Sequence, residues 1–520
     1  MKCIRRISVS LFAIIVFALL TGCGSGGSSG GPSPVVVLDT QQATIGVDGG
    51  TIQSATVTDA PSIEIPANAL GGPATVTLEV LDADPAPPAN PQVQLIGKSV
   101  RLQVSGSEVK DGAKIILHMH TIPLAGKTVV RGYIKDNVWI VDKAGESPSE
   151  LTGEITIPAT SLGVSRTRGN FWDSLGKATV GFFAIPKIQL TGAVPMDVWR
   201  FDYNQGTNTG VWVRDNGTGS FTAGKIALLV HGFFAGTHTD FSDLAKHISS
   251  AQTVGNDSRD AYKVYAVEYP TGYGIGKLGE KLASIINSRT SIGVKIDLLA
   301  HSMGGLVARS AIENYGADIH VAKLVTMSTP HIGQTTSFLF SALVNSKPIF
   351  VAGGISNPWV PEFDDLSVDS PFLDHLNNGV QVDCRYYSAV GIDANKPEPY
   401  KLGGLNISWI SNSLLMLPND GMVEEVSSGC PLGGECAHFD KMEFSLNHDY
   451  IKRDSTVFQQ IDNWLGIGNT GDVNVQVDDN PNGDTGDVNV EIDTKPGDDT
   501  GDVNVEIDSR RGSTPSRRIF

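Results

Sequence analysis

The stretch that most constrains the fold lies near the middle of the chain, at residues 296–305. It reads Ile-Asp-Leu-Leu-Ala-His-Ser-Met-Gly-Gly, and apolar residues then recur with helical spacing over 306–312. This pattern predicts a strand, a sharp turn and a helix, with Ser302 at the apex of the turn. Ala300 and Gly304 keep the flanking positions nearly free of side chain, which lets strand and helix approach each other. The alternative is an ordinary serine at a helix N-cap.

Length and charge limit the remaining possibilities. The chain has 520 residues, of which 40% are hydrophobic, and a formal net charge of −17. At about 150 residues per domain, roughly two to four domains are expected, with ample apolar material for buried cores. Phosphate binding requires clustered Lys and Arg side chains, and the sequence has no such cluster. We therefore expect no nucleic-acid partner.

The first 23 residues have the layout of an export signal. Basic residues between 2 and 6 precede an apolar core over 7–20, which is too short for a comfortable membrane span. The ending Leu-Thr-Gly-Cys resembles the lipobox of bacterial lipoproteins, which implies cleavage before Cys23 and acylation of that residue. The chain would then be exported and lipid-anchored to the bacterial cell envelope, at the outer membrane because Gly24 follows the cysteine. Ordinary secretion with a free Cys23 is the alternative.

A first folded domain is expected at 35–187, after a flexible Gly-, Ser- and Pro-rich tether at 24–34. Short alternating segments separated by Gly, Pro and Asp turns predict an antiparallel β-sandwich here. Val-Asp-Gly-Gly-Thr-Ile at 47–52 and Ile-Glu-Ile-Pro-Ala-Asn-Ala-Leu at 63–70 resemble the β-sandwich domain shared by ankyrins and netrin receptors. The resemblance implies that 181–185 is the closing strand of the domain.

A second domain, at 188–467, alternates strand and helix patterns. Apolar strands are predicted at 225–230, 263–267, 296–300, 322–327 and 385–390, with helices at 278–288 and 456–465. Such a series indicates a mostly parallel sheet covered by helices on both faces. Functional residues of these sheets lie beyond the carboxyl ends of the strands, where the motifs described next fall.

A serine nucleophile needs a base that takes its proton and an acid that orients the base. When the serine occupies a strand-turn-helix of this kind, the acid and then the histidine follow it along the chain. Asp420, in Asn-Asp-Gly-Met-Val, is the first candidate for the acid, and Asp393 is the second. His448, in Asn-His-Asp-Tyr before the last predicted helix, is the first candidate for the base, and His438 is the second.

An acyl-transfer intermediate also needs two N–H donors for its oxyanion. The segment Val-His-Gly-Phe-Phe-Ala-Gly-Thr at 230–237 offers the N–H of Phe233, and the turn after the serine offers that of Met303. His231 precedes the serine and is therefore interpreted as a structural loop residue, and His301 as packing or polar lining.

Five motifs in this order resemble the bacterial lipases and esterases of the α/β-hydrolase superfamily. They are the 230–237 segment, Ala-His-Ser-Met-Gly-Gly, Ser-Thr-Pro-His-Ile-Gly, Asn-Asp-Gly-Met-Val and Asn-His-Asp-Tyr, and they span roughly 225–466. The resemblance implies an α/β-hydrolase domain in which Ser302 is the nucleophile, Asp420 the acid and His448 the base. It also implies that Phe233 and Met303 donate to the oxyanion.

Residues 333–383 form a long insertion rich in apolar side chains, including Trp359. Both a lid that opens on an apolar substrate and ordinary buried packing fit this composition. The calcium site of the related lipases does not carry over, because Asp449 and Tyr450 do not reproduce its spacing around the histidine. We therefore expect no metal and no cofactor.

Cysteine usage is compatible with an exported protein. Cys3 is lost with the signal and Cys23 is acylated, so Cys384, Cys430 and Cys436 remain. One disulfide and one leftover thiol are expected in a compartment that permits disulfides, and the pairing is left open.

The last segment, 468–520, is repetitive and acidic. Thr-Gly-Asp-Val-Asn-Val begins a 15-residue repeat at 470, 485 and 500, and residues 470–520 contain 12 acidic and 5 basic side chains. This composition predicts a disordered acidic tail, and a small calcium-binding β-repeat is the alternative.

Taken together, these patterns predict a lipase-like serine ester hydrolase that acts through an acyl-enzyme on lipid or other apolar esters outside the cytoplasm. An acyltransferase that uses the same three residues is one alternative. A catalytically inactive surface-binding protein is another, and the β-sandwich and repeats favour it. The patterns identify no protein partner.

Overall fold

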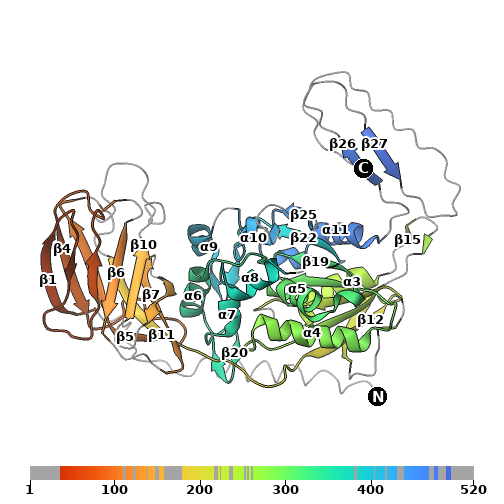
Figure 1. The fold of residues 1–520 in the computed structure, drawn as a ribbon, viewed down its shortest axis with the longest axis horizontal. Coiled ribbons are helices and arrows are strands. Elements are labelled where there is room, and N and C mark those ends of the chain that lie inside the picture. The colour runs from red at the N-terminus through yellow and green to blue at the C-terminus, as the bar shows by residue number, and fades with distance from the viewer. Residues whose placement is uncertain are drawn as a thin grey trace, which may run out of the picture.

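The computed structural model describes most of the chain between residues 35 and 492. The described ranges are 35–107, 109–110, 113–120, 125–135, 138–146, 151–156, 178–215, 221–222, 224–233, 238–250, 253–254, 257–258, 262–379, 382, 384–402, 404–415, 418–429, 439–467, 473–477 and 488–492. They form a sheet-rich N-terminal region and a larger α/β region, joined by an extended segment (Figure 1).

The N-terminal region consists of two antiparallel sheets. One has the order β1-β4-β5-β11-β7-β8 and the other the order β2-β3-β6-β10-β9. The strands are β1 (Val37–Ile45), β2 (Gly50–Ile52), β3 (Ser62–Ile65), β4 (Ala74–Leu81), β5 (Gln94–Ser105), β6 (Lys114–Met119), β7 (Lys127–Lys135), β8 (Val138–Lys143), β9 (Gly145–Glu146), β10 (Leu151–Thr156) and β11 (Ala178–Pro186). Every second residue of β4 is buried, and side chains of both sheets share one apolar core that includes Val76, Leu117 and Phe182. The likeness to the ankyrin and netrin-receptor domain stays a prediction.

The α/β region is built on an eight-stranded sheet of order β13-β12-β17-β14-β18-β19-β22-β25. The strands are β12 (Asp197–Asn204), β13 (Thr209–Arg214), β14 (Ile226–Val230), β17 (Lys263–Glu268), β18 (Ile296–His301), β19 (Val321–Met327), β22 (Arg385–Gly391) and β25 (Phe439–Phe444). The six strands from β17 to β25 run parallel, which confirms the predicted parallel sheet. The antiparallel hairpin β12–β13 at one edge and β25 at the other were not predicted.

Helices cover both faces of this sheet, as the apolar strands require. Leu228 and Leu298 face the side covered by α4 (Ile275–Arg289) and α5 (Met303–Tyr315), whereas Leu229 and Leu299 face the side covered by α3 (Ser242–Ser249) and α11 (Ser455–Leu465). Successive strand residues point to opposite faces, so a strand buried on both sides is apolar at every position.

The insertion after β19 packs between the two regions (Figure 1). It contains α6 (Thr336–Asn345), β20 (Val351–Ala352), β21 (Ile355–Ser356), α7 (Pro361–Asp365) and α8 (Pro371–Asn377). The side chain of Asn345 in α6 accepts a hydrogen bond from the backbone N–H of Trp139 in β8 at 3.0 Å. It also donates one to the backbone carbonyl of Trp139 at 2.6 Å. Trp359 N–H donates to the Pro186 carbonyl at 2.6 Å, and the Trp359 side chain is fully buried. Leu343, Val344 and Trp359 of the insertion belong to the same buried apolar cluster as Trp139 and Phe183 of the N-terminal region, so these side chains pack between the two regions.

The remaining described elements are short. They are η1 (His238–Phe241), β15 (Thr253–Val254), β16 (Asp257–Ser258), η2 (Asp318–His320), β23 (Lys401–Leu402), β24 (Leu405–Asn406), α9 (Ser408–Leu414), α10 (Glu425–Gly429), η3 (Tyr450–Lys452), β26 (Val473–Val477) and β27 (Val488–Ile492). β26 and β27 belong to consecutive acidic repeats and pair antiparallel, whereas most of 468–520 lies outside the described residues. The predicted signal, Cys23 and the tether at 24–34 also lie outside them. Within the described ranges, no helix has the length and apolar character needed to cross a bilayer.

Candidate active site

Ser302 lies at the sharp turn between β18 and α5, as the sequence predicts. Its backbone has φ 56° and ψ −134°, a conformation that residues with a side chain rarely adopt. The Ser302 N–H donates to the Met327 carbonyl of β19 at 2.9 Å, and the Thr329 hydroxyl donates to the Ser302 carbonyl at 2.9 Å. These two contacts hold the strained turn at the carboxyl end of the sheet.

Glycines around the turn are required by close approach. A Cβ atom on Gly232 would lie 2.6 Å from the Ser302 Cβ, and one on Gly304 would lie 2.4 Å from the His231 carbonyl oxygen. A Cβ atom on Gly305 would lie 2.1 Å from the Thr329 hydroxyl oxygen. The flanking glycines therefore let the serine-bearing turn pack directly against the loops that surround it.

The structure brings His448 and Asp420 together. His448 Nδ1 donates a hydrogen bond to Asp420 Oδ2 at 2.8 Å, and both side chains are buried. The other carboxylate oxygen, Oδ1, accepts from the N–H groups of Met422 at 2.8 Å and Val423 at 2.7 Å. Both oxygens of Asp420 are therefore committed, and the carboxylate fixes the proton of His448 on Nδ1, leaving Nε2 as an acceptor.

The His448 loop is anchored by its backbone. Its N–H donates to the Asp420 carbonyl at 2.9 Å, and its carbonyl accepts from His301 Nε2 at 2.8 Å. The His301 ring lies 4.7 Å from the His448 ring, measured between centroids. Burial holds the pKa of His301 well below its usual value, with a smaller contribution from the charge of Lys452. His301 is thus neutral, and its hydrogen bond links the serine-bearing turn to the histidine loop. From sequence, it was expected only to pack or to line the site.

Asp393, the second candidate for the acid, is not hydrogen-bonded to His448. Asp393 accepts hydrogen bonds from the Asn395 N–H at 3.0 Å and the Ser445 hydroxyl at 3.4 Å, whereas the hydrogen bond of His448 Nδ1 goes to Asp420. His438 lies outside the described residues. The geometry therefore favours Asp420 over Asp393 as the partner of His448.

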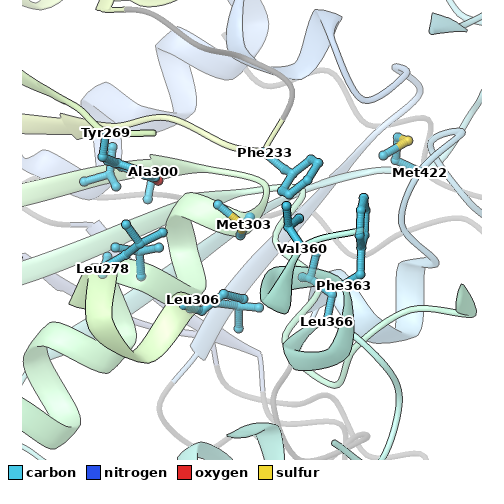
Figure 2. Packing of buried hydrophobic residues seen from close by; sticks show 14 of the residues in the cluster. Phe233, Tyr269, Leu278, Ala300, Met303, Leu306, Val360, Phe363, Leu366 and Met422 are labelled. Carbon is cyan, nitrogen blue, oxygen red and sulfur yellow. The ribbon is translucent and has the colours of Figure 1, made fainter. Parts of the chain in front are cut away.

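Phe233 and Met303 lie next to the serine. Met303 is the first residue of α5 and is buried. Phe233 follows Gly232, the glycine that packs directly against Ser302. The Phe233 ring packs against Phe350 and Phe363 of the insertion, with centroid distances of 5.2 Å and 4.8 Å. Figure 2 shows Phe233 between Met303 and the Phe363 side of the insertion. The insertion therefore holds the loop that carries one of the two predicted oxyanion donors.

His231 is structural, as predicted. Its Nδ1 donates to the Gly232 carbonyl at 2.8 Å, and its Nε2 accepts from the Tyr269 N–H at 3.2 Å. The ring stacks on Tyr269 at a centroid distance of 4.0 Å, and burial lowers its pKa. This neutral histidine ties the 230–233 loop to the chain that follows β17.

Ser302 and His448 line one cavity of about 320 Å³. Its walls also include residues that the sequence analysis did not single out, from the loops 398–402 and 449–453: Glu398, Pro399, Tyr400, Lys401, Leu402, Lys452 and Arg453. No motif marks Tyr400. No motif marks Lys452 either, although it lies at the end of η3, four residues after His448.

Two further predictions have partial outcomes. Cys384 is buried at the start of β22, and its thiol lies 3.8 Å from the Arg385 carbonyl oxygen. Cys430 and Cys436 lie outside the described residues, so the disulfide stays a prediction. Over the part of the chain that the structure describes, no group of three or more His, Cys, Asp or Glu residues is placed to hold a metal ion.

Comparison with known proteins gives one family match. Residues 222–351 match the family model described as "Putative serine esterase (DUF676)". The match includes Phe233, Ser302 and Met303 but ends before Asp420 and His448. A search of curated proteins found no match.

Several solved structures are similar in outline. Bacillus licheniformis lipase BlEst2 in its mature form is 18% identical, with 48% of this chain and 96% of that chain covered and a TM-score of 0.35. The metagenomic carboxyl esterase MGS0156 is 17% identical, with 44% and 66% covered and a TM-score of 0.33. Phospholipase PlaB from Legionella pneumophila is 17% identical, with 40% and 46% covered and a TM-score of 0.29. Similarity at this level does not identify the substrate of this chain.

The strained turn at Ser302 lies inside the matched residues, whereas strands β22 and β25 and the hydrogen-bonded pair of His448 and Asp420 lie beyond them. Together they support an α/β-hydrolase of the lipase and esterase type as the larger region of this chain.

Proposed function

We propose that this protein is a serine-dependent carboxylic ester hydrolase. Ser302 is the nucleophile, His448 the general base, Asp420 its orienting acid, and the N–H groups of Phe233 and Met303 stabilise the oxyanion. One observation carries the proposal. His448, which is hydrogen-bonded to the buried Asp420, lines the same small cavity as a serine held in a strained strand-to-helix turn.

In the proposed mechanism, His448 Nε2 takes the proton of Ser302 as the hydroxyl oxygen attacks the ester carbonyl. The tetrahedral intermediate places its negative oxygen near the N–H groups of Phe233 and Met303. His448 then gives the proton to the leaving alcohol, which departs and leaves an acyl-enzyme. Water, deprotonated by the same imidazole, attacks the acyl group, and release of the carboxylic acid restores the serine hydroxyl.

We further propose lipid or other apolar esters as substrates, and a location outside the cytoplasm with the chain anchored through a lipid on Cys23. The lipobox-like sequence at 20–23 supports the anchor. The apolar residues Phe233, Leu402 and Met422 in the lining of the cavity support an apolar part in the substrate. Incorporation of radiolabelled palmitate into the wild-type chain, and its loss in Cys23→Ser, tests the anchor.

The ester hydrolase proposal is tested with the chain lacking residues 1–23 and p-nitrophenyl esters of increasing acyl length, beside Ser302→Ala. Removal of the nucleophile should lower kcat by about 10⁶-fold, to the background rate of the assay, while circular dichroism stays unchanged. Retained turnover in Ser302→Ala would refute the assignment. Product analysis in the presence of an added alcohol separates hydrolysis from acyl transfer by the same acyl-enzyme.

A further inference from the structure

The residues that line the catalytic cavity include both apolar and charged side chains. Six of its lining residues carry a carboxylate, an ammonium or a guanidinium group: Asp240, Glu398, Lys401, Asp449, Lys452 and Arg453. The three charges of each sign cancel formally, but they are not equally exposed. Glu398 and Lys401 are exposed at the rim, where water screens their charges, whereas Lys452 is 3% exposed. Asp240 and Asp449 are partly buried and Arg453 is exposed, so Lys452 is the most buried of the six charged side chains that line the cavity.

The buried ammonium is only partly compensated. Lys452 Nζ lies 2.7 Å from Asp449 Oδ1, and the Arg453 guanidinium lies 3.3 Å from Asp449 Oδ2. One carboxylate is thus shared by two cations. The electrostatic effect of Lys452 reaches the site itself, because it contributes, after burial, to the lowered pKa of His301. An ammonium has three N–H donors, and Asp449 accepts from one side of it.

Tyr400 supplies a second donor among the lining residues. Its position is fixed by its N–H, which donates to the Ala394 carbonyl at 2.9 Å, and by its carbonyl, which accepts from the Ile407 N–H at 3.1 Å. Its ring meets the His448 ring edge-on, with a centroid distance of 6.0 Å and an angle of 65°. Burial, and then the negative charge of Asp449, raise the pKa of Tyr400, so the hydroxyl stays protonated.

The Tyr400 hydroxyl makes no hydrogen bond with any described residue, although it lines the cavity beside His448. Tyr400 is partly exposed, so water can meet this hydroxyl in the free protein, and a bound substrate that displaces the water must supply an acceptor in its place. An acceptor on the bound substrate would satisfy both this hydroxyl and the partly compensated ammonium.

We propose that the cavity binds esters that carry an anionic group, a carboxylate or a phosphate, a short distance from the scissile ester, and that Lys452 and Tyr400 hold this group. This inference rests on the proposed esterase function and narrows its substrate class. A purely aliphatic chain placed along the same wall would cover the ammonium and the phenol without giving either an acceptor, which costs binding free energy. The volume of about 320 Å³ suits a short substrate segment.

The test compares two pairs of matched esters with the chain lacking residues 1–23. In the acyl-side pair, the monoester of adipic acid with p-nitrophenol is compared with p-nitrophenyl heptanoate. In the alcohol-side pair, butanoyl glycerol phosphate is compared with butanoyl glycerol. In at least one pair, kcat/KM should be about tenfold or more higher for the anionic ester, the effect expected of a charge-assisted hydrogen bond in a buried site. The preferred pair identifies which side of the ester carries the charge.

Two variants separate the proposed contacts. Lys452→Met and Tyr400→Phe should each reduce the anionic-to-neutral ratio of kcat/KM by about tenfold. Tyr400→Phe removes only an unpartnered hydroxyl, so it remains informative if Lys452→Met fails to fold. Lys277→Met, which removes an exposed cation of α4 that does not line the cavity, is the matched control and should keep the wild-type ratio.

Equal or faster turnover of the neutral ester in both pairs would overturn the anionic-substrate inference and leave the esterase proposal standing. A wild-type preference that survives unchanged in Tyr400→Phe and in folded Lys452→Met would overturn the assigned contacts. Absence of Ser302-dependent turnover on all four esters would instead refute the proposed esterase, and the inference with it.

Discussion

Replacing Asp420 by Asn should abolish most of the activity for a reason that the hydrogen bonds specify. In the wild type, Asp420 Oδ1 accepts from the N–H groups of Met422 and Val423, and Oδ2 accepts from His448 Nδ1. The amide oxygen of Asn must occupy the Oδ1 position, because an NH₂ group there would face two donors. The NH₂ group then faces His448 Nδ1, which can only meet it with a lone pair.

This arrangement forces the His448 proton onto Nε2. A protonated Nε2 has no free lone pair and can no longer accept the proton of Ser302. The same replacement in a serine protease, where it leaves the wrong tautomer, lowers kcat by about 10⁴-fold. A loss of this size corresponds to about 5 kcal/mol in the activation barrier. We expect kcat for p-nitrophenyl butanoate to fall by about 10⁴-fold in Asp420→Asn.

Asp393→Asn is the matched control, because its carboxylate accepts hydrogen bonds from Asn395 and Ser445 and not from His448. Its kcat should stay within about threefold of the wild type. The tautomer argument would be refuted if Asp420→Asn kept more than about a tenth of the wild-type kcat. It would also be refuted if Asp393→Asn were the inactive variant.

Three further predictions concern packing and pH. Gly305→Ala places a Cβ atom 2.1 Å from the Thr329 hydroxyl oxygen, so urea unfolding should show a loss of about 1–3 kcal/mol, and an unchanged midpoint would contradict this. Asn345→Ala leaves the Trp139 N–H and carbonyl without their partner, and a loss of about 2–3 kcal/mol is expected in the same assay; less than about 0.5 kcal/mol would show that the contact does not join the two regions. Burial raises the pKa of Asp365 from 3.8 to about 6, so the folded state binds this proton more tightly than the unfolded state does. The free energy of unfolding should therefore fall as pH rises from 3.8 to about 6, and Asp365→Asn should flatten that fall in melting temperatures measured across the range.

The parallel sheet and the serine turn were readable from sequence because each depends on local pattern. Strands buried on both faces are apolar at nearly every position, which marks 226–230 and, apart from Asp297 and His301, 296–301 without any knowledge of their neighbours. The turn at Ser302 needs small neighbours for a steric reason that the sequence displays directly. The hairpin β12–β13 was missed, because its strands mix polar and apolar residues at a sheet edge.

The composition of the cavity depends on contacts that no local pattern encodes. Tyr400 reaches His448 because two backbone hydrogen bonds fold the 394–407 segment back over the site, and this geometry leaves no trace in residue spacing. From sequence alone, the apolar composition of the insertion at 333–383 fits both a lid and buried packing. Its contacts with Trp139 and Pro186 come from a region about 200 residues away in the chain, which only the tertiary structure reveals.

The central claim is that Ser302 is a nucleophile activated by His448, and covalent labelling tests it most directly. A fluorophosphonate reacts with an activated serine and stays attached, so tandem mass spectrometry of the digested protein can locate the added mass. The account predicts one modification, on the peptide that contains Ser302, and much slower labelling in His448→Ala. Labelling of a different serine, or no labelling of the folded wild-type protein, would contradict it.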